Sequence, residues 1–257
     1  MIDFTLNTYE KYLKAIQSKY DNILRFDEYF ISDPKPTSFC IIRHDVDRKP
    51  VNALRMANLE YNIGIKSTYF FRATSQTFIP NIIQNIASFG HEIGYHYENL
   101  AKSKGNIEKA IEDFDYNLSN FRRITPVRTI SMHGSPLSSY DNKELWINQV
   151  NHDLLMNKYG ILGEVTLDID YTTIAYINDT GRNWSSTKSN IRDKVESLIN
   201  LEFKDGRNLY SYLLNEPHQK MIFQIHPERW SSNFYQFIIQ YCKDKAINTV
   251  KFILSGR

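Results

Sequence analysis

The stretch from Phe39 to Asp47 most constrains the fold, because an apolar run ends there in a crowd of charged side chains. Residues 39–42 show no helical period and are typical of a strand buried on both faces. The strand runs directly into four polar side chains: Arg43, His44, Asp45 and Asp47. Charge at the end of a buried strand is costly, which indicates that these residues form a site.

The spacing of Asp45 and Asp47 is informative in itself. In an extended backbone, side chains two residues apart point the same way. Two carboxylates side by side repel each other unless a cation or a proton lies between them. The alternative interpretation is a pair of loop aspartates that cap a helix starting at Pro50.

Composition excludes several classes of partner. A net charge of +2 is too small to indicate nucleic acid or an anionic membrane. No apolar run is long enough to span a membrane, and the N-terminus resembles no secretory signal, so we expect a cytoplasmic protein. We expect Cys40 and Cys242 to be small apolar core residues. The sequence carries no signal for an oligomeric state.

Strand and helix patterns alternate along the chain, which predicts an α/β fold of parallel strands covered by helices. Strands are predicted at 39–42, 67–71, 91–96, 128–133, 161–168, 172–177 and 220–226. Helices are predicted at 8–20, 25–30, 50–64, 79–89, 106–121, 190–201, 209–214 and 232–245, with helical stretches in 145–159. We expect one domain, 1–257, in which residues 1–36 form a helical prefix to the main body, 37–257.

Three further strands end in histidine, at His96, His133 and His226. The carboxyl ends of parallel strands meet at one rim, so we expect these rings to converge with Asp45 and Asp47. Histidine nitrogens and carboxylate oxygens together fit a divalent transition metal, zinc first. A cation of this kind, with a carboxylate to take a proton and a histidine to give one, is typical of hydrolases.

These motifs resemble the polysaccharide deacetylases, the nodulation-factor and chitin-deacetylase type of carbohydrate esterase. The resemblance covers about residues 39–230 and rests on Asp45-Val-Asp47, Gly90-His-Glu-Ile-Gly-Tyr-His96 and Ile225-His226-Pro227. It implies an irregular (β/α)7 barrel that removes N- or O-acetyl groups from sugars with zinc or a similar metal. It also implies an aspartate base and a metal-binding aspartate in the first motif, histidine ligands in the second and a general acid in the last.

The chain departs from the family pattern in three places. The family's adjacent aspartates are separated here by Val46, its second ligand histidine falls on Leu100, and its arginine-bearing third motif is replaced by Ser131-Met-His-Gly-Ser-Pro136. We expect His133 to replace the missing ligand. A looser resemblance is to deacetylase-like proteins of bacterial surface-polysaccharide clusters, which also show Arg-His-Asp-Val-Asp and the run His226-Pro-Glu-Arg-Trp230.

The expected site follows from these motifs. Asp47, His96 and His133 bind the metal, Asp45 activates water and His226 is the general acid, although the two aspartates could exchange roles. We expect a second shell of His44 and Glu98, with a core contact as the alternative for His44. The expected substrate-binding residues are Arg43, Asp179, Arg182, Trp184 and Trp230. The alternative for the middle three is a solvated turn, and the alternative for Arg43 is a pair with one of the two carboxylates that follow it.

The predicted function is deacetylation of an N-acetylated sugar or sugar precursor in bacterial surface-polysaccharide synthesis. The predicted partner is therefore a carbohydrate. Two alternatives stay open: an amidohydrolase acting on a small C–N bond outside sugars, and a degenerate member that binds glycan without hydrolysis. Leu100 is the feature that favours the second alternative.

Overall fold

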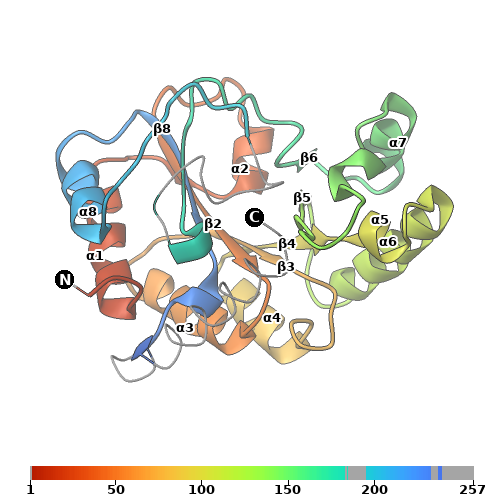
Figure 1. The fold of residues 1–257 in the computed structure, drawn as a ribbon, viewed down its shortest axis with the longest axis horizontal. Helices are drawn as coiled ribbons and strands as arrows, with labels where there is room; N and C mark the ends of the chain where they lie inside the picture. The colour runs from red at the N-terminus through yellow and green to blue at the C-terminus, as the bar shows by residue number, and fades with distance from the viewer. Residues whose placement is uncertain (1, 183, 185–194, 233–236, 239–257) are drawn as a thin grey trace.

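The computed structural model describes residues 2–182, 184, 195–232, 237 and 238 (Figure 1). Its strands are β1 (Ile23–Leu24), β2 (Phe39–Val46), β3 (Thr68–Phe71), β4 (Glu92–Tyr97), β5 (Thr129–Met132), β6 (Gly163–Glu164), β7 (Ala175–Asn178) and β8 (Lys220–Ile225). They pair in parallel in the order β6-β5-β4-β3-β2-β8-β7, with β1 beside β2. The sheet curls into an incomplete barrel, which confirms the predicted irregular (β/α)7 fold.

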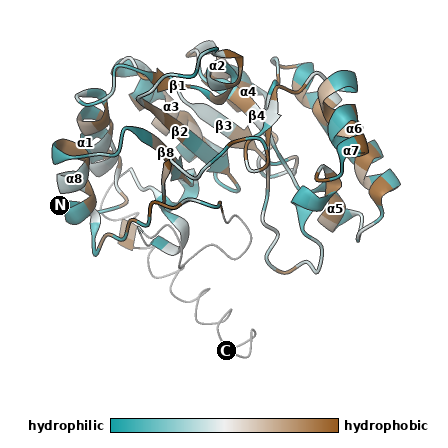
Figure 2. Cartoon of the chain, turned by 90° about the horizontal axis from the view of Figure 1, so that it is seen from above, coloured by the Kyte–Doolittle hydropathy of each residue, from teal (hydrophilic) through white to brown (hydrophobic). Residues whose placement is uncertain are grey.

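The helices cover the outer face of this sheet. They are α1 (Leu6–Gln17), α2 (Phe26–Ile31), α3 (Pro50–Asn62), α4 (Pro80–Ser88), α5 (Asn99–Lys102), α6 (Ile107–Arg122), α7 (Gln149–Asp153) and α8 (Gly206–Asn215). Short helical turns are η1 (Asn142–Leu145), η2 (Leu154–Lys158), η3 (Thr180–Arg182) and η4 (Pro227–Arg229). Figure 2 shows α1 and α8 toward one end of the row of strands and α5, α6 and α7 toward the other.

Local sequence explains where the main helices begin. Pro50 and Pro80 occupy the first turns of α3 and α4, where proline removes no helical hydrogen bond. The side chain of Asn106 accepts a hydrogen bond from the backbone of Lys109 and caps α6. The helix predicted at 190–201 is wrong for residues 195–201, which are not helical, and 190–194 lie outside the described residues. Cys242 and most of the helix predicted at 232–245 also lie outside them.

The prefix packs against the barrel through aromatic side chains. One face of α1 buries Tyr9, Tyr12 and Ile16 against the cluster that also contains Trp184 and Trp230. The prefix contributes strand β1 as well, which pairs with β2. Two residues are too few to show a period, so this strand was not visible in the sequence pattern.

Alternation along β2 places the charged residues inside the barrel. Phe39 and Ile41 belong to the cluster of apolar side chains that fills the barrel interior. Cys40 and Ile42 belong to a cluster under the helices. Because side chains alternate between faces, the next odd-numbered positions of the strand also face inward. The barrel interior is therefore apolar at the amino-terminal half of β2 and polar at its carboxyl-terminal half.

Among the described residues, no helix is both long enough and apolar enough to cross a membrane.

Candidate active site

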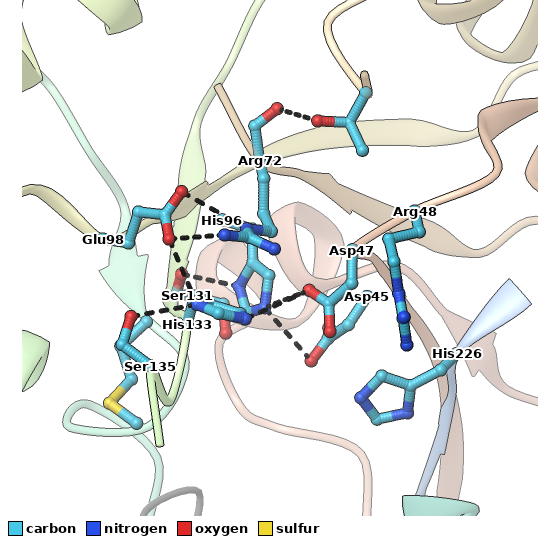
Figure 3. A network of polar contacts seen from close by, with 12 residues as sticks. Asp45, Asp47, Arg48, Arg72, His96, Glu98, Ser131, His133, Ser135 and His226 are labelled. Carbon is cyan, nitrogen blue, oxygen red and sulfur yellow. Dashed lines mark hydrogen bonds and ion pairs between the residues drawn. The ribbon is translucent and has the colours of Figure 1, made fainter. Parts of the chain in front are cut away.

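Asp47, His96 and His133 come together at the carboxyl ends of β2, β4 and β5 (Figure 3). Asp47 Oδ1 lies 3.5 Å from Nε2 of His96 and 3.6 Å from Nε2 of His133. The two imidazole planes are nearly perpendicular, at 86°. The side chains of Asp47 and His133 are 19% and 15% exposed, so the group opens to solvent on this side.

In His96 and His133, the hydrogen bond made by Nδ1 determines which ring nitrogen carries the proton. His96 Nδ1 lies 3.0 Å from the backbone carbonyl of Ser131, and a carbonyl only accepts, so Nδ1 donates. His133 Nδ1 lies 3.3 Å from the Glu98 carboxylate and 3.1 Å from the Ser135 hydroxyl. In the neutral rings, the lone pairs on Nε2 therefore point at the Asp47 carboxylate.

Lone pairs facing a carboxylate oxygen need a proton or a cation between them. Asp47 Oδ1 is buried and has no hydrogen-bond partner among the described residues. Two ligand atoms about 2.1 Å from one tetrahedral zinc are about 3.4 Å apart, close to the two distances that Asp47 makes. In the described part of the chain, no three His, Cys, Asp or Glu side chains are already placed to hold a metal ion, so Asp47, His96 and His133 would have to move to bind one. One carboxylate oxygen and two imidazole nitrogens are donor atoms that fit zinc. In each histidine, Nδ1 also makes the hydrogen bond to a neighbouring carbonyl or carboxylate that is typical of a metal ligand.

The titration of these groups follows from their surroundings. Burial lowers the pKa of His96 to about 4 in spite of Asp45 and Asp47 nearby, which leaves the ring neutral at pH 7. Burial alone would raise the pKa of Asp47 and lower that of His133. Their mutual attraction reverses both effects: the pKa of Asp47 is lowered and that of His133 is raised.

Asp45 is fully buried and held by Arg43 two residues earlier on β2. The Arg43 guanidinium donates to both carboxylate oxygens at 2.8 Å and to the Ser131 hydroxyl at 2.5 Å. Gln224 donates a further hydrogen bond to Asp45 at 2.5 Å. Burial would raise the pKa of Asp45, but the guanidinium lowers it well below its usual range. Asp45 is therefore a carboxylate at all ordinary pH values.

His226 lies across the site from the two other histidines (Figure 3). Its Nδ1 is 2.6 Å from Asp179 Oδ1, and its backbone N–H donates to the same carboxylate. Burial and Arg229 favour the neutral ring, but Asp179 raises the pKa of His226 to about 9. His226 is therefore a protonated imidazole at neutral pH that can give up a proton.

Glu98 contacts Nδ1 of His133, on the side of the ring away from Asp47. Arg72 donates to Glu98 at 2.6 Å, and Lys102 Nζ lies 3.1 Å from the other oxygen. Burial would raise the pKa of Glu98, but its hydrogen bonds to His133 and Arg72 lower it well below its usual range. Glu98 thus occupies the position that the sequence predicted for it, behind a candidate ligand.

Four of the predicted substrate-binding residues are buried instead. The Arg43 guanidinium lies under Asp45, and Arg43 is 1% exposed. Asp179 is engaged by His226, Arg229 and Trp230, whose indole N–H donates to it at 2.9 Å. Trp184 stacks between Phe4 and Phe223, with ring centroids 5.3 and 5.7 Å away. The burial of these four residues contradicts the prediction that they contact substrate.

The fifth such residue, Arg182, is partly exposed and turned toward the prefix. Its guanidinium lies 5.0 Å from the centre of the Phe4 ring. This contact is a cation–π interaction with the segment before α1. The geometry gives no sign that Arg182 faces the site.

His44 faces the opposite side of β2 from Asp45. Its Nε2 lies 2.7 Å from Glu60 and 3.2 Å from the Tyr9 hydroxyl, and its ring stacks on Tyr69. The second-shell prediction is corrected in favour of the alternative, a core contact. His91 lies in the same cluster, 3.6 Å from Glu60.

Sequence reasoning missed Gln224, Ser131 and Glu228. Gln224 and Ser131 lie on the inward faces of β8 and β5, two residues before His226 and His133, so alternation could have found them. Glu228 follows His226 by two residues and is 3% exposed. The pKa of Glu228 is raised to about 7, mainly by burial and secondly by the negative charge of Asp47.

Leu100 is buried in the apolar cluster under α6 and points away from the metal candidates. It lies in the short helix α5, which directly follows Glu98. The family's second histidine therefore has no counterpart at this position. His133, which directly follows the neighbouring strand β5, lies beside His96, with the two ring centroids 5.2 Å apart.

No family model matches the sequence, and no curated protein matches it either. Solved structures similar to the chain include the Xyl-CE4 domain of a multidomain xylanase from the hindgut metagenome of Trinervitermes trinervoides. They also include the catalytic domain of a peptidoglycan N-acetylglucosamine deacetylase from Eubacterium rectale, and a CE4 family pseudoenzyme from Bacillus anthracis.

These likenesses are distant. Sequence identities are 12%, 18% and 13%, and TM-scores are 0.41, 0.44 and 0.45, in the same order. The matches cover 82%, 80% and 80% of this chain and 84%, 84% and 60% of the other chains.

Proposed function

We propose that this protein is a metal-dependent hydrolase that removes an acetyl group from an N-acetylated sugar or sugar precursor. One observation supports this proposal above the others: Asp47 Oδ1 is buried, faces two imidazole nitrogens and has no hydrogen-bond partner in the described part of the chain. A buried carboxylate oxygen without a hydrogen-bond partner is rare in proteins and needs an explanation. A bound cation is the simplest explanation here. The bacterial surface-polysaccharide setting rests on the motif resemblance alone.

The proposed cation ligands are Asp47, His96 and His133. When bound, zinc or a similar cation would polarise the acyl carbonyl and make water a stronger nucleophile at neutral pH. Three protein ligands leave a coordination position open, as in catalytic zinc sites.

The other groups of the site would move the protons. Asp45, held as a carboxylate by Arg43, accepts the proton of the attacking water. Its lowered pKa makes it a weak base, so its task is orientation and brief proton acceptance. His226, protonated and held by Asp179, donates a proton to the departing amine and so prevents the amide from re-forming.

Acetate release tests this proposal directly. Purified protein is supplied with zinc and assayed against N-acetylglucosamine oligosaccharides, with free acetate as the readout. We expect turnover in the wild type, and a loss of at least a hundredfold in Asp45→Asn and in His226→Ala, the range for losing an acid–base group. His152→Ala is the matched control, since His152 pairs with Asp168 and not with any group of the site. Wild-type protein that binds zinc but releases no acetate would contradict the proposal.

A second function, glycan binding without hydrolysis, has one observation in its favour. Asp45 is fully buried, and both of its oxygens already accept hydrogen bonds from Arg43. A carboxylate that is saturated in this way is a poor base. Under this alternative, the wild type and Asp45→Asn would bind the oligosaccharides equally and neither would release acetate.

A further inference from the structure

Cationic side chains at the mouth of the site differ in how tightly they are held. In the described residues, three of them lie within hydrogen-bond distance of carboxylates: Arg72 at 2.6 Å and Lys102 at 3.1 Å from Glu98, and Arg229 at 3.3 Å from Asp179. Arg48 differs, because its carboxylate partner among the described residues, Glu228, lies 3.7 Å away. That distance is an ion pair without a hydrogen bond, so the guanidinium keeps its donors.

Arg48 is also well placed to meet a substrate. It directly follows Asp47, and its side chain is 51% exposed. Figure 3 shows it extending past Asp47 toward His226. A half-exposed guanidinium beside a candidate ligand and a candidate acid is accessible to whatever occupies the site.

Glu228 lies opposite Arg48 on the turn η4. Its side chain is 4% exposed, and its Oε2 is buried without a hydrogen-bond partner among the described residues. The turn η4 is fastened to α3 by Asn52, which donates to the carbonyls of Pro227 and Trp230 at 3.2 and 3.0 Å. Glu228 is therefore held below the surface, while the half-exposed guanidinium of Arg48 can reach an anion at the mouth of the site.

The position of Arg48 decides which part of a substrate it meets. His226 is the group that faces the leaving side of the scissile bond, which in a sugar amide is the sugar. Arg48 reaches toward His226, so it would contact the sugar and not the acyl group. An arginine presents a planar fork of N–H donors that matches a carboxylate or a phosphate group.

We propose that Arg48 selects sugars that carry an anionic group, a carboxylate or a phosphate, close to the acylated position. This inference rests on the proposed function for the orientation of the sugar. It narrows the substrate class from N-acetylated sugars in general to acidic or phosphorylated ones.

Calorimetric titration of the purified full chain tests the inference without any need for turnover. The probes are D-glucuronic acid, α-D-glucose 1-phosphate and neutral methyl α-D-glucoside. We expect at least one anionic probe to bind roughly tenfold or more tightly than the neutral one, as a hydrogen bond to a charged group allows. The anion that binds better identifies the carboxylate or the phosphate as the preferred group.

Two variants complete the experiment. Arg48→Gln should remove the preference for the anionic probe, and Arg55→Gln, a change of the same charge at an exposed position of α3, should keep it. Equal binding of all three probes, or a preference that survives in Arg48→Gln, would overturn the inference. A failure of the hydrolase proposal would show as absent acetate release and would leave the binding preference in place.

Discussion

Asp179 and His226, 47 residues apart in sequence, form a 2.6 Å contact between a carboxylate oxygen and a ring nitrogen inside the barrel. Asp179 comes from the segment after β7 and His226 from the end of β8, the neighbouring strand. The carboxylate fixes the orientation of the ring and raises the pKa of His226 to about 9. Asp179 is therefore a positioning residue for the candidate acid.

This contact predicts a specific change in pH dependence. A general acid works only while protonated, so activity should fall as pH rises through the pKa of His226, near 9. Asp179→Asn removes the negative charge that raises this pKa. The alkaline limb of kcat/KM should then move to lower pH, by about one unit or more. The pH–rate profile measures the shift, and NMR titration of the His226 ring checks it without turnover.

Asp168→Asn provides the matched control for this experiment, because Asp168 holds a different histidine, His152, at 2.8 Å. Its pH–rate profile should follow the wild type. An unmoved alkaline limb in Asp179→Asn, with a folded protein, would show that His226 does not supply the proton.

The buried pair of Arg43 and Asp45 predicts a stability effect. Arg43→Met leaves the Asp45 charge buried without its partner, which should lower the free energy of unfolding by about 3–5 kcal/mol. Adding Asp45→Asn removes that charge, so the double variant should recover part of the loss. Urea denaturation at pH 7 measures both. A double variant less stable than Arg43→Met alone would contradict this account of the pair.

Glu98 predicts an effect on metal affinity. Glu98→Gln keeps the size of the side chain but removes the charge that orients His133, so zinc affinity should fall about 10- to 100-fold. Competition with a chromogenic chelator measures the affinity. Glu144→Gln, an exchange of the same kind in η1, should bind zinc like the wild type. Equal affinities in all three proteins would mean that His133 is not held for a metal.

Much of the fold could be predicted because its signals are local. The eight residues of β2 alternate between an apolar helix-covered face and the barrel interior, and the run of charges after Ile42 marks where the strand reaches the mouth. Histidines that end strands could be predicted to share a rim because parallel strands share one direction. The structure brings Asp45, Asp47, His96 and His133 to that rim as anticipated.

What could not be predicted depends on contacts between distant segments. Trp184 and Trp230 look like sugar-stacking rings in sequence, but Phe4 and Tyr9 of the N-terminal prefix cover Trp184 and Trp230, respectively. Nothing local distinguishes an indole that stacks on a sugar from one that packs under a helix. For Arg43, the sequence left two partners open, a neighbouring carboxylate or a substrate group, and the structure shows the carboxylate of Asp45. The depth at which Arg43 is buried could not be predicted, because it depends on how β2 pairs with its neighbouring strands.

The most direct test of the central claim is zinc stoichiometry. Chelator-treated protein is titrated with zinc, and bound metal is counted by plasma mass spectrometry after desalting. The wild type and the His152→Ala control should retain one equivalent per chain, whereas Asp47→Asn and His133→Ala should retain almost none. Full retention in His133→Ala, or no zinc in the wild type, would contradict a cation held by Asp47, His96 and His133.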